Sequence, residues 1–253
     1  MLTDCHAHLD FEKDNKNIEF ILEESKKRNV KYIIHAGLNK ESNLFGLKLN
    51  QKNKMVLPAL GLYPEEVVKK TNDEIKEELK FIEENVDKAV AISEVGLDST
   101  YGSLEKQKEV FEQIIKIAIK HNKAMVIHTR KAEKDVVELL DKVIPNENLL
   151  YRKIVFHCFT GKKKLVTEAL KRGWFFSVPP IVVRNQQFQE LVKLVPLNRL
   201  LTETDSPFLG PKKEERNYPW NVSYSIKEIA KIKSVTVQEA ENNIFMNFTY
   251  LFL

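Results

Sequence analysis

Short apolar runs alternate eight times with longer amphipathic segments, and this alternation limits the chain to few folds. The runs are rich in β-branched residues, as buried strands are. The predicted strands span Leu2–His6, Lys31–His35, Val56–Leu60, Ala89–Ser93, Ala124–His128, Ile154–His157, Trp174–Val178 and Arg199–Thr202. Between and after them, apolar residues recur three or four positions apart, which predicts helices. The predicted helices span Asn17–Arg28, Ser42–Gln51, Asn72–Val86, Ser103–His121, Glu133–Val143, Lys163–Arg172, Gln186–Leu194, Ser223–Ile232 and Val237–Phe252.

A strand followed by a helix, repeated in this way, predicts a parallel sheet, because parallel strands must be joined by crossover connections. A chain of 253 residues with 43% hydrophobic content can form one large core and has the typical length of a (β/α)8 barrel. We therefore predict an α/β fold, a single-domain TIM barrel over residues 1–253. A doubly wound open sheet is the competing architecture.

Charge and cysteine content set further expectations. The net charge is +4, from 40 basic and 36 acidic residues, so the total alone does not argue for a nucleic-acid partner. Two cysteines, Cys5 and Cys158, cannot form a disulfide framework, which favours the cytoplasm. No apolar run approaches the roughly 20 residues that a membrane span needs. We expect no membrane association, and no obligate protein partner is evident.

Histidines and carboxylates follow the ends of several predicted strands. The set is His6, His8, Glu94, His128, His157 and Asp205. In a barrel these strand ends meet at one mouth, where the active site lies. Packed together, such side chains would repel one another or lie unsatisfied without a cation, whereas imidazole nitrogen and carboxylate oxygen are ligands for zinc, manganese and related ions. Six donors exceed one tetrahedral site and predict two divalent metal ions that share a bridging ligand.

The two remaining histidines are controls for this interpretation. His35 ends the second predicted strand, and we expect a satisfied core or rim histidine rather than a ligand. His121 lies near the end of a predicted helix, where a cation interacts favourably with the helix dipole. We assign no chemistry to either residue.

Taken in order, six segments resemble the TatD family of metal-dependent deoxyribonucleases, within the amidohydrolase-like barrels. They are Asp4-Cys5-His6-Ala7-His8-Leu9-Asp10, Gly61-Leu62-Tyr63-Pro64, Ser93-Glu94-Val95-Gly96-Leu97-Asp98, Ile127-His128-Thr129-Arg130, His157-Cys158-Phe159-Thr160-Gly161 and Glu203-Thr204-Asp205-Ser206-Pro207. The resemblance implies a hydrolase that uses zinc, manganese or magnesium to cleave phosphodiesters. It also implies that the six donors are metal ligands, with Glu94 as the bridge between the two ions.

A metal-activated hydroxide is the expected nucleophile, because a divalent ion lowers the pKa of bound water to about 7. We assign catalytic roles to Asp205, which would orient this water and accept its proton, and to the bridging Glu94. The chain departs from the family at Tyr63, where many members have histidine. Tyrosine can donate a hydrogen bond to a phosphate oxygen but carries no positive charge near neutral pH, so we expect Tyr63 to bind substrate differently.

Cations after the fifth, sixth and seventh strands are candidate phosphate contacts, namely Arg130, Lys162 and Arg184. The resemblance implies that the phosphodiester substrate is DNA, which we expect to be single-stranded or bound at strand ends. Phe159 and Trp220 are candidates for stacking on a base, with core or lid packing as the alternative.

Two other functions stay open at this point. The same metal centre would serve another hydrolase that cleaves an ester or amide, such as a D-aminoacyl-tRNA deacylase, because the pocket beyond the metals sets the substrate. A non-catalytic nucleic-acid-binding barrel is the second alternative, and missing ligands would favour it.

Overall fold

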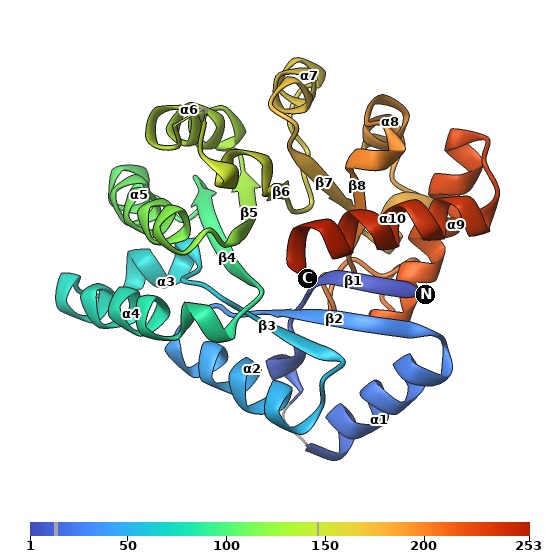
Figure 1. The fold of residues 1–253 in the computed structure, drawn as a ribbon, viewed down its shortest axis with the longest axis horizontal. Coiled ribbons are helices and arrows are strands. Elements are labelled where there is room, and N and C mark those ends of the chain that lie inside the picture. Colours follow the sequence, from blue (N-terminus) through green and yellow to red (C-terminus); the bar gives the residue numbers. More distant parts are fainter. Residues whose placement is uncertain (13–14, 146) are drawn as a thin grey trace.

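The computed structural model describes residues 1–12, 15–145 and 147–253 and has the predicted barrel architecture (Figure 1). One sheet of eight parallel strands runs in sequential order from β1 to β8, which excludes the doubly wound alternative, because that fold departs from sequential order. The strands are β1 (Leu2–Ala7), β2 (Val30–Ala36), β3 (Val56–Leu60), β4 (Ala91–Asp98), β5 (Ala124–Arg130), β6 (Ile154–Phe156), β7 (Phe175–Val178) and β8 (Leu200–Thr202).

Helices surround the strands on the outside of the barrel, and the last helix packs across one of its ends (Figure 1). They are α1 (Asn15–Lys27), α2 (Lys40–Lys52), α3 (Pro64–Lys69), α4 (Asn72–Asn85), α5 (Leu104–His121), α6 (Glu133–Val143), α7 (Lys163–Lys171), α8 (Gln186–Leu194), α9 (Val222–Lys233) and α10 (Val237–Phe252). The apolar periodicity does not predict α3, because six residues that begin at a proline are too few to show a helical repeat. Among the described residues, no helix is both long and apolar enough to cross a membrane.

β4 ends later than the sequence predicts, at Asp98 instead of Ser93. The extra residues pair with β5, where Gly96 lies opposite His128 and Asp98 lies opposite Arg130. A Cβ atom at Gly96 would lie 2.1 Å from the His128 carbonyl oxygen, so the two strands approach each other closely only because this residue is glycine. Glu94 therefore projects from a paired strand rather than from a loop.

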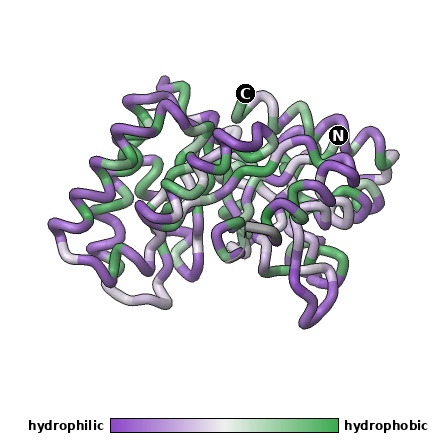
Figure 2. Tube along the Cα trace, turned by 90° about the horizontal axis from the view of Figure 1, so that it is seen from below, coloured by the Kyte–Doolittle hydropathy of each residue, from purple (hydrophilic) through white to green (hydrophobic). Residues whose placement is uncertain are grey.

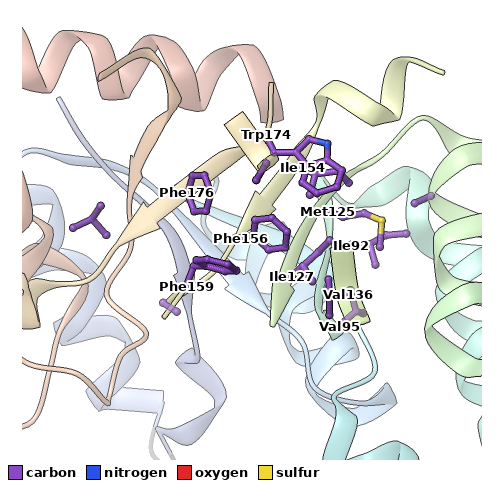
Figure 3. Packing of buried hydrophobic residues seen from close by; sticks show 14 of the residues in the cluster. Ile92, Val95, Met125, Ile127, Val136, Ile154, Phe156, Phe159, Trp174 and Phe176 are labelled. Carbon is purple, nitrogen blue, oxygen red and sulfur yellow. The ribbon is translucent and has the colours of Figure 1, made fainter. Parts of the chain in front are cut away.

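The larger hydrophobic cluster lies between the strands and the outer helices. Figure 3 shows part of it, where Phe156 of β6 and Phe176 of β7 lie near Trp174. The rings of Phe156 and Trp174 meet edge to face, with centroids 5.5 Å apart. Hydrophilic and hydrophobic stretches alternate along the outer helices in Figure 2, as expected for helices with one buried face.

A second cluster fills the barrel and is closed by α10. Its strand members include Ala91 and Ala124, which begin β4 and β5, so the cluster reaches the amino-terminal end of the strands. Phe248, Leu251 and Phe252 of α10 pack on this end. The opposite, carboxyl-terminal end of the barrel is thereby left for polar residues.

Hydrogen bonds from the chain after β8 join the last strand to the first. The buried carboxylate of Asp4 accepts hydrogen bonds from the Thr204 backbone nitrogen, at 2.8 Å, and from the Thr204 hydroxyl. The backbone nitrogen of Asp205 donates to the His6 carbonyl oxygen at 2.8 Å. These bonds fix Asp205 beside β1, although about 200 residues separate them in the sequence.

A buried amide on α2 holds the end of β3 against β4. Asn43 donates to the Gly61 carbonyl oxygen and accepts from the Gly61 nitrogen, both at 2.9 Å. A Cβ atom at Gly61 would lie 2.2 Å from the Glu94 nitrogen, so Gly61 packs directly on the backbone that carries Glu94. Asn43 therefore helps to position Glu94 without touching its side chain.

We expect Asn43→Ala to lower the free energy of unfolding by about 2–4 kcal/mol, because two buried backbone groups would lose their partners. Urea unfolding, monitored by circular dichroism, measures this change. Asn50→Ala is the matched control, since the Asn50 amide on the same helix makes one bond, to the Val56 carbonyl oxygen at 2.7 Å. An equal loss in the two variants would contradict the role given to Asn43.

Candidate metal centre

The six predicted donors meet at the carboxyl-terminal end of the barrel in overlapping groups. Within each group the donor atoms lie within 4.8 Å of one another. The groups are His6 with His8 and Glu94, Glu94 with His128 and His157, and His6 with His157 and Asp205. Because members are shared between groups, the six side chains form one continuous cluster.

The Glu94 carboxylate lies between two pairs of histidines. Its Oε2 atom is 3.5 Å from His6 Nε2 and 3.3 Å from His8 Nε2. Its Oε1 atom is 2.8 Å from His128 Nδ1 and 3.6 Å from His157 Nε2. Each carboxylate oxygen thus faces a different pair of imidazole nitrogens, which is the arrangement expected of a bridging ligand.

Asp205 adds a second carboxylate on the side of His6 and His8. Its Oδ1 atom is 3.7 Å from His6 Nε2 and 3.4 Å from His8 Nε2. The His8 ring is fixed from behind, because its Nδ1 atom donates to the Ala36 carbonyl oxygen at 3.1 Å. With Nδ1 protonated, the Nε2 lone pair of His8 faces the cluster.

Carboxylates behind the cluster orient the other pair of histidines. His128 Nε2 donates to Asp98 Oδ2 at 3.1 Å, and His157 Nδ1 donates to Glu203 Oε2 at 2.6 Å. A metal-ligating histidine usually donates its other nitrogen to such a partner, which fixes the tautomer and raises the basicity of the ligating nitrogen. The buried donor set therefore fits divalent cations.

The charge states of the cluster agree with cation binding. Burial alone would raise the pKa of Glu94, but hydrogen bonds from His128 and His6 outweigh burial and hold this pKa well below its ordinary value. Burial alone would lower the pKa of His157, but the Glu203 carboxylate outweighs it and raises this pKa to about 9. Glu94 is thus ionised, and a bound cation would replace the proton of His157.

A family model described as TatD related DNase matches residues 3–253. The chain belongs to the TatD family. Deoxyribonuclease TATDN3 from Homo sapiens is 33% identical over 264 residues, which cover 99% of this chain and 94% of that protein. An uncharacterized metal-dependent hydrolase from Methanocaldococcus jannaschii is 34% identical over 246 residues, which cover 96% of this chain and 94% of that protein. With these relatives and its donor cluster, the chain is a metal-dependent hydrolase that binds divalent metal.

Solved structures confirm the fold. A TatD homologue from Escherichia coli superposes with a TM-score of 0.89 at 22% identity and covers 99% of this chain and 97% of its own. The phosphotriesterase homology protein from Escherichia coli, solved with phosphate in its active site, has a TM-score of 0.72 at 16% identity, with 100% and 98% covered. At these identities the likeness concerns the barrel alone.

Asp98 and Glu203 are positioning residues that the sequence pattern alone does not reveal, although both lie in segments that resemble the TatD family. Glu203 is fully buried, and its Oε1 atom also accepts a hydrogen bond from the Cys158 nitrogen at 3.0 Å. The sequence does contain a signal for both residues, because each lies in the same family-like segment as a predicted ligand. It does not reveal which histidine each carboxylate holds, since His157 and Glu203, for example, are 46 residues apart.

The control histidines lie outside the cluster, as expected. His35 is buried, accepts a hydrogen bond from the Leu9 nitrogen at 3.3 Å and donates to the Ser42 carbonyl oxygen at 3.1 Å. Burial lowers the pKa of His35 to about 4, so the ring is neutral and fully satisfied. His121 pairs with Asp87 at 3.2 Å on the outer surface.

Tyr63 lies at the edge of the cluster, at the start of α3. Its ring meets the His128 ring edge to face, with centroids 5.1 Å apart, and lies 5.9 Å from the Tyr101 ring. Burial raises the pKa of Tyr63, and the charge of Glu94 adds to this shift, so the phenol stays protonated as a hydrogen-bond donor.

The three candidate phosphate contacts differ in their surroundings. Arg130 and Lys162 are exposed, at the end of β5 and at the start of α7. Arg184 instead donates to the carbonyl oxygens of Pro211 and Gly210, at 3.2 and 3.3 Å. Its guanidinium group therefore holds the long loop after β8.

The two candidate stacking aromatics pack within the protein. Phe159 is only 1% exposed, and its ring lies 5.0 Å from that of Phe156 (Figure 3), so core packing accounts for it. Trp220 stacks on Tyr218 with centroids 4.5 Å apart, and the Arg28 guanidinium lies 5.2 Å from its ring. Neither ring is a base-stacking surface in this arrangement.

We expect Glu203→Gln to weaken zinc affinity about 10- to 100-fold, because a neutral amide no longer holds the His157 ring by a charged hydrogen bond. Competition with a chromophoric chelator measures the affinity. Glu190→Gln is the control, because Glu190 is an exposed residue of α8 paired with Lys193. Unchanged zinc affinity in Glu203→Gln would refute the positioning role of this carboxylate.

Proposed function

We propose that this chain hydrolyses phosphodiester bonds of DNA with two divalent metal ions, zinc, manganese or magnesium, and that residues 1–253 act as one functional unit. One observation carries the proposal: a single buried carboxylate, Glu94, faces one histidine pair through each of its oxygens. Two-metal phosphoesterases use a shared ligand of this kind. The names of the two relatives, deoxyribonuclease and metal-dependent hydrolase, support the same reaction.

His6, His8 and Asp205 would hold one ion and His128 and His157 the other, with Glu94 shared. When bound, the ions lower the pKa of a water molecule and stabilise negative charge on phosphate oxygens.

Asp205 would act on the attacking water. Its Oδ1 atom faces His6 and His8, so we assign acceptance of the water proton to Oδ2. The Asp205 side chain is 15% exposed, and water from the mouth can therefore reach it.

Tyr63 would donate a hydrogen bond from its phenolic hydroxyl to a phosphate oxygen, because its ring lies against His128 at the edge of the cluster. Arg130 and Lys162 would contact the substrate backbone at the exposed mouth. Arg184 would contribute through the loop that it holds, at Gly210 and Pro211.

We expect wild-type protein to cleave single-stranded DNA, to lose this activity after dialysis against a chelator, and to regain it with added zinc, manganese or magnesium. Asp205→Asn should lower turnover about 100-fold or more, because the amide cannot accept the proton. Gel analysis of a labelled oligonucleotide measures cleavage, and circular dichroism checks that the variant is folded.

D-aminoacyl-tRNA is assayed in parallel, since the same metal centre would serve a deacylase. Deacylation without DNA cleavage would refute DNA hydrolysis and assign the chain as a deacylase instead. Chelator-resistant DNA cleavage, or wild-type turnover in Asp205→Asn, would refute the mechanism.

We also expect binding of single-stranded DNA to weaken steeply with salt, because phosphate contacts release counterions. Arg130→Gln and Lys162→Gln should each reduce the slope of log affinity against log salt by roughly 0.7. Fluorescence anisotropy of a labelled oligonucleotide at several salt concentrations measures this slope, with calcium in place of the catalytic metal so that binding is followed without cleavage. Lys116→Gln, on the outer face of α5, is the control that should leave the slope unchanged. Unaltered slopes in the first two variants would exclude these contacts.

A further inference from the structure

Two exposed aromatic rings lie together beside the metal centre. Phe11 is 43% exposed and Phe208 is 49% exposed, and their rings meet edge to face with centroids 5.5 Å apart. The Phe11 ring also lies 5.7 Å from the His8 ring. An apolar surface of two rings therefore begins next to a metal donor and continues into solvent.

The backbone fixes both rings relative to the donors. Phe11 is three residues after His8, in a short 3-10 helix that begins directly after it. Phe208 is three residues after Asp205, and its nitrogen donates to the Asp205 carbonyl oxygen at 2.8 Å. The His8 nitrogen donates to the Ser206 carbonyl oxygen at 2.9 Å, which joins the two segments.

An ion pair also joins the same two segments. Arg216, in the loop after β8, pairs with Glu12, the residue that follows Phe11. Both rings are therefore held in place by contacts that do not cover their exposed surfaces. A preorganised surface of this kind binds a planar group without a large ordering cost.

The position of the pair distinguishes it from the other exposed apolar side chains. In the described part of the chain, those other side chains lie on outer helices, on the turn before β6 or at the ends of the sequence. They are Met1, Phe20, Leu149, Tyr224, Val237, Met246, Tyr250 and Leu253. Scattered apolar residues of that kind are ordinary, whereas paired rings beside a reactive centre indicate a binding surface.

We propose that Phe11 and Phe208 form a stacking platform for one unpaired nucleobase adjacent to the scissile phosphate. The inference rests on the proposed function and deepens it. A base offers a flat π-face to an aromatic ring only when it is not stacked within a duplex, so the platform selects unpaired nucleotides. The rings carry no hydrogen-bonding group, and selection among the four bases is therefore weak.

The test combines protein variants with an oligonucleotide series in which one nucleotide at a time, on either side of the cleavage site, is replaced by an abasic analogue. For wild-type protein we expect one abasic position to raise KM about tenfold, in keeping with the loss of one stacked base. Phe208→Leu and Phe11→Leu should raise KM for the intact oligonucleotide by a similar factor. On the abasic oligonucleotide, the same substitutions should raise KM by less than about twofold, because the stacked base is already missing.

Phe208→Tyr keeps the ring and should retain wild-type KM. Phe20→Leu is the matched control, because Phe20 is an exposed residue of α1 away from the metal centre, and it should also leave KM unchanged. Wild-type KM in both Phe11→Leu and Phe208→Leu would overturn the platform. Equal increases in KM on intact and abasic DNA would overturn it too. A changed sedimentation coefficient with unchanged KM would assign the rings to self-association instead. Failure of wild-type protein to cleave the intact oligonucleotide would instead refute the proposed function, and the platform with it.

Discussion

The rest of the site depends on one buried, ionised carboxylate. Glu94 is only 3% exposed, yet hydrogen bonds from the surrounding imidazoles hold its pKa well below the ordinary value despite burial. A buried charge is tolerated only when it is paired, so the strands must deliver histidines to it from several directions. A parallel barrel does this readily, because all of its strands end on one side.

The barrel places the donor side chains close together, and contacts behind the cluster orient their rings. Asp98 and Glu203 each hold the far nitrogen of one histidine, while the Ala36 carbonyl oxygen holds that of His8. Farther out, Asn43 clamps Gly61 against the backbone that carries Glu94. Each layer fixes the one inside it, which is what a metal centre requires if its ligands are to keep one tautomer and one rotamer.

Features with a regular pattern can be predicted from this sequence, whereas features that depend on spatial neighbours cannot. The strands before His6 and His128 were apparent as apolar runs, and the barrel topology then placed their ends together. The extension of β4 to Asp98 was not apparent, because it depends on pairing with β5. Phe159 shows the same limit, since only the fold reveals that its ring is enclosed by the core.

Aromatic residues at the mouth lie beside the donor cluster without being part of it. Tyr63 lies against His128 on one side, and Phe11 lies against His8 on the other. Of the six donors, His6, Glu94 and His128 lie within strands, and the other three follow strand ends directly or within a few residues. Tyr63, Phe11 and Phe208 all lie on segments outside the strands. Such segments change without disturbing the sheet, because their backbone is not part of the ladder. If the proposed roles of these rings hold, substrate selection in this chain is separable from the chemistry and resides in them.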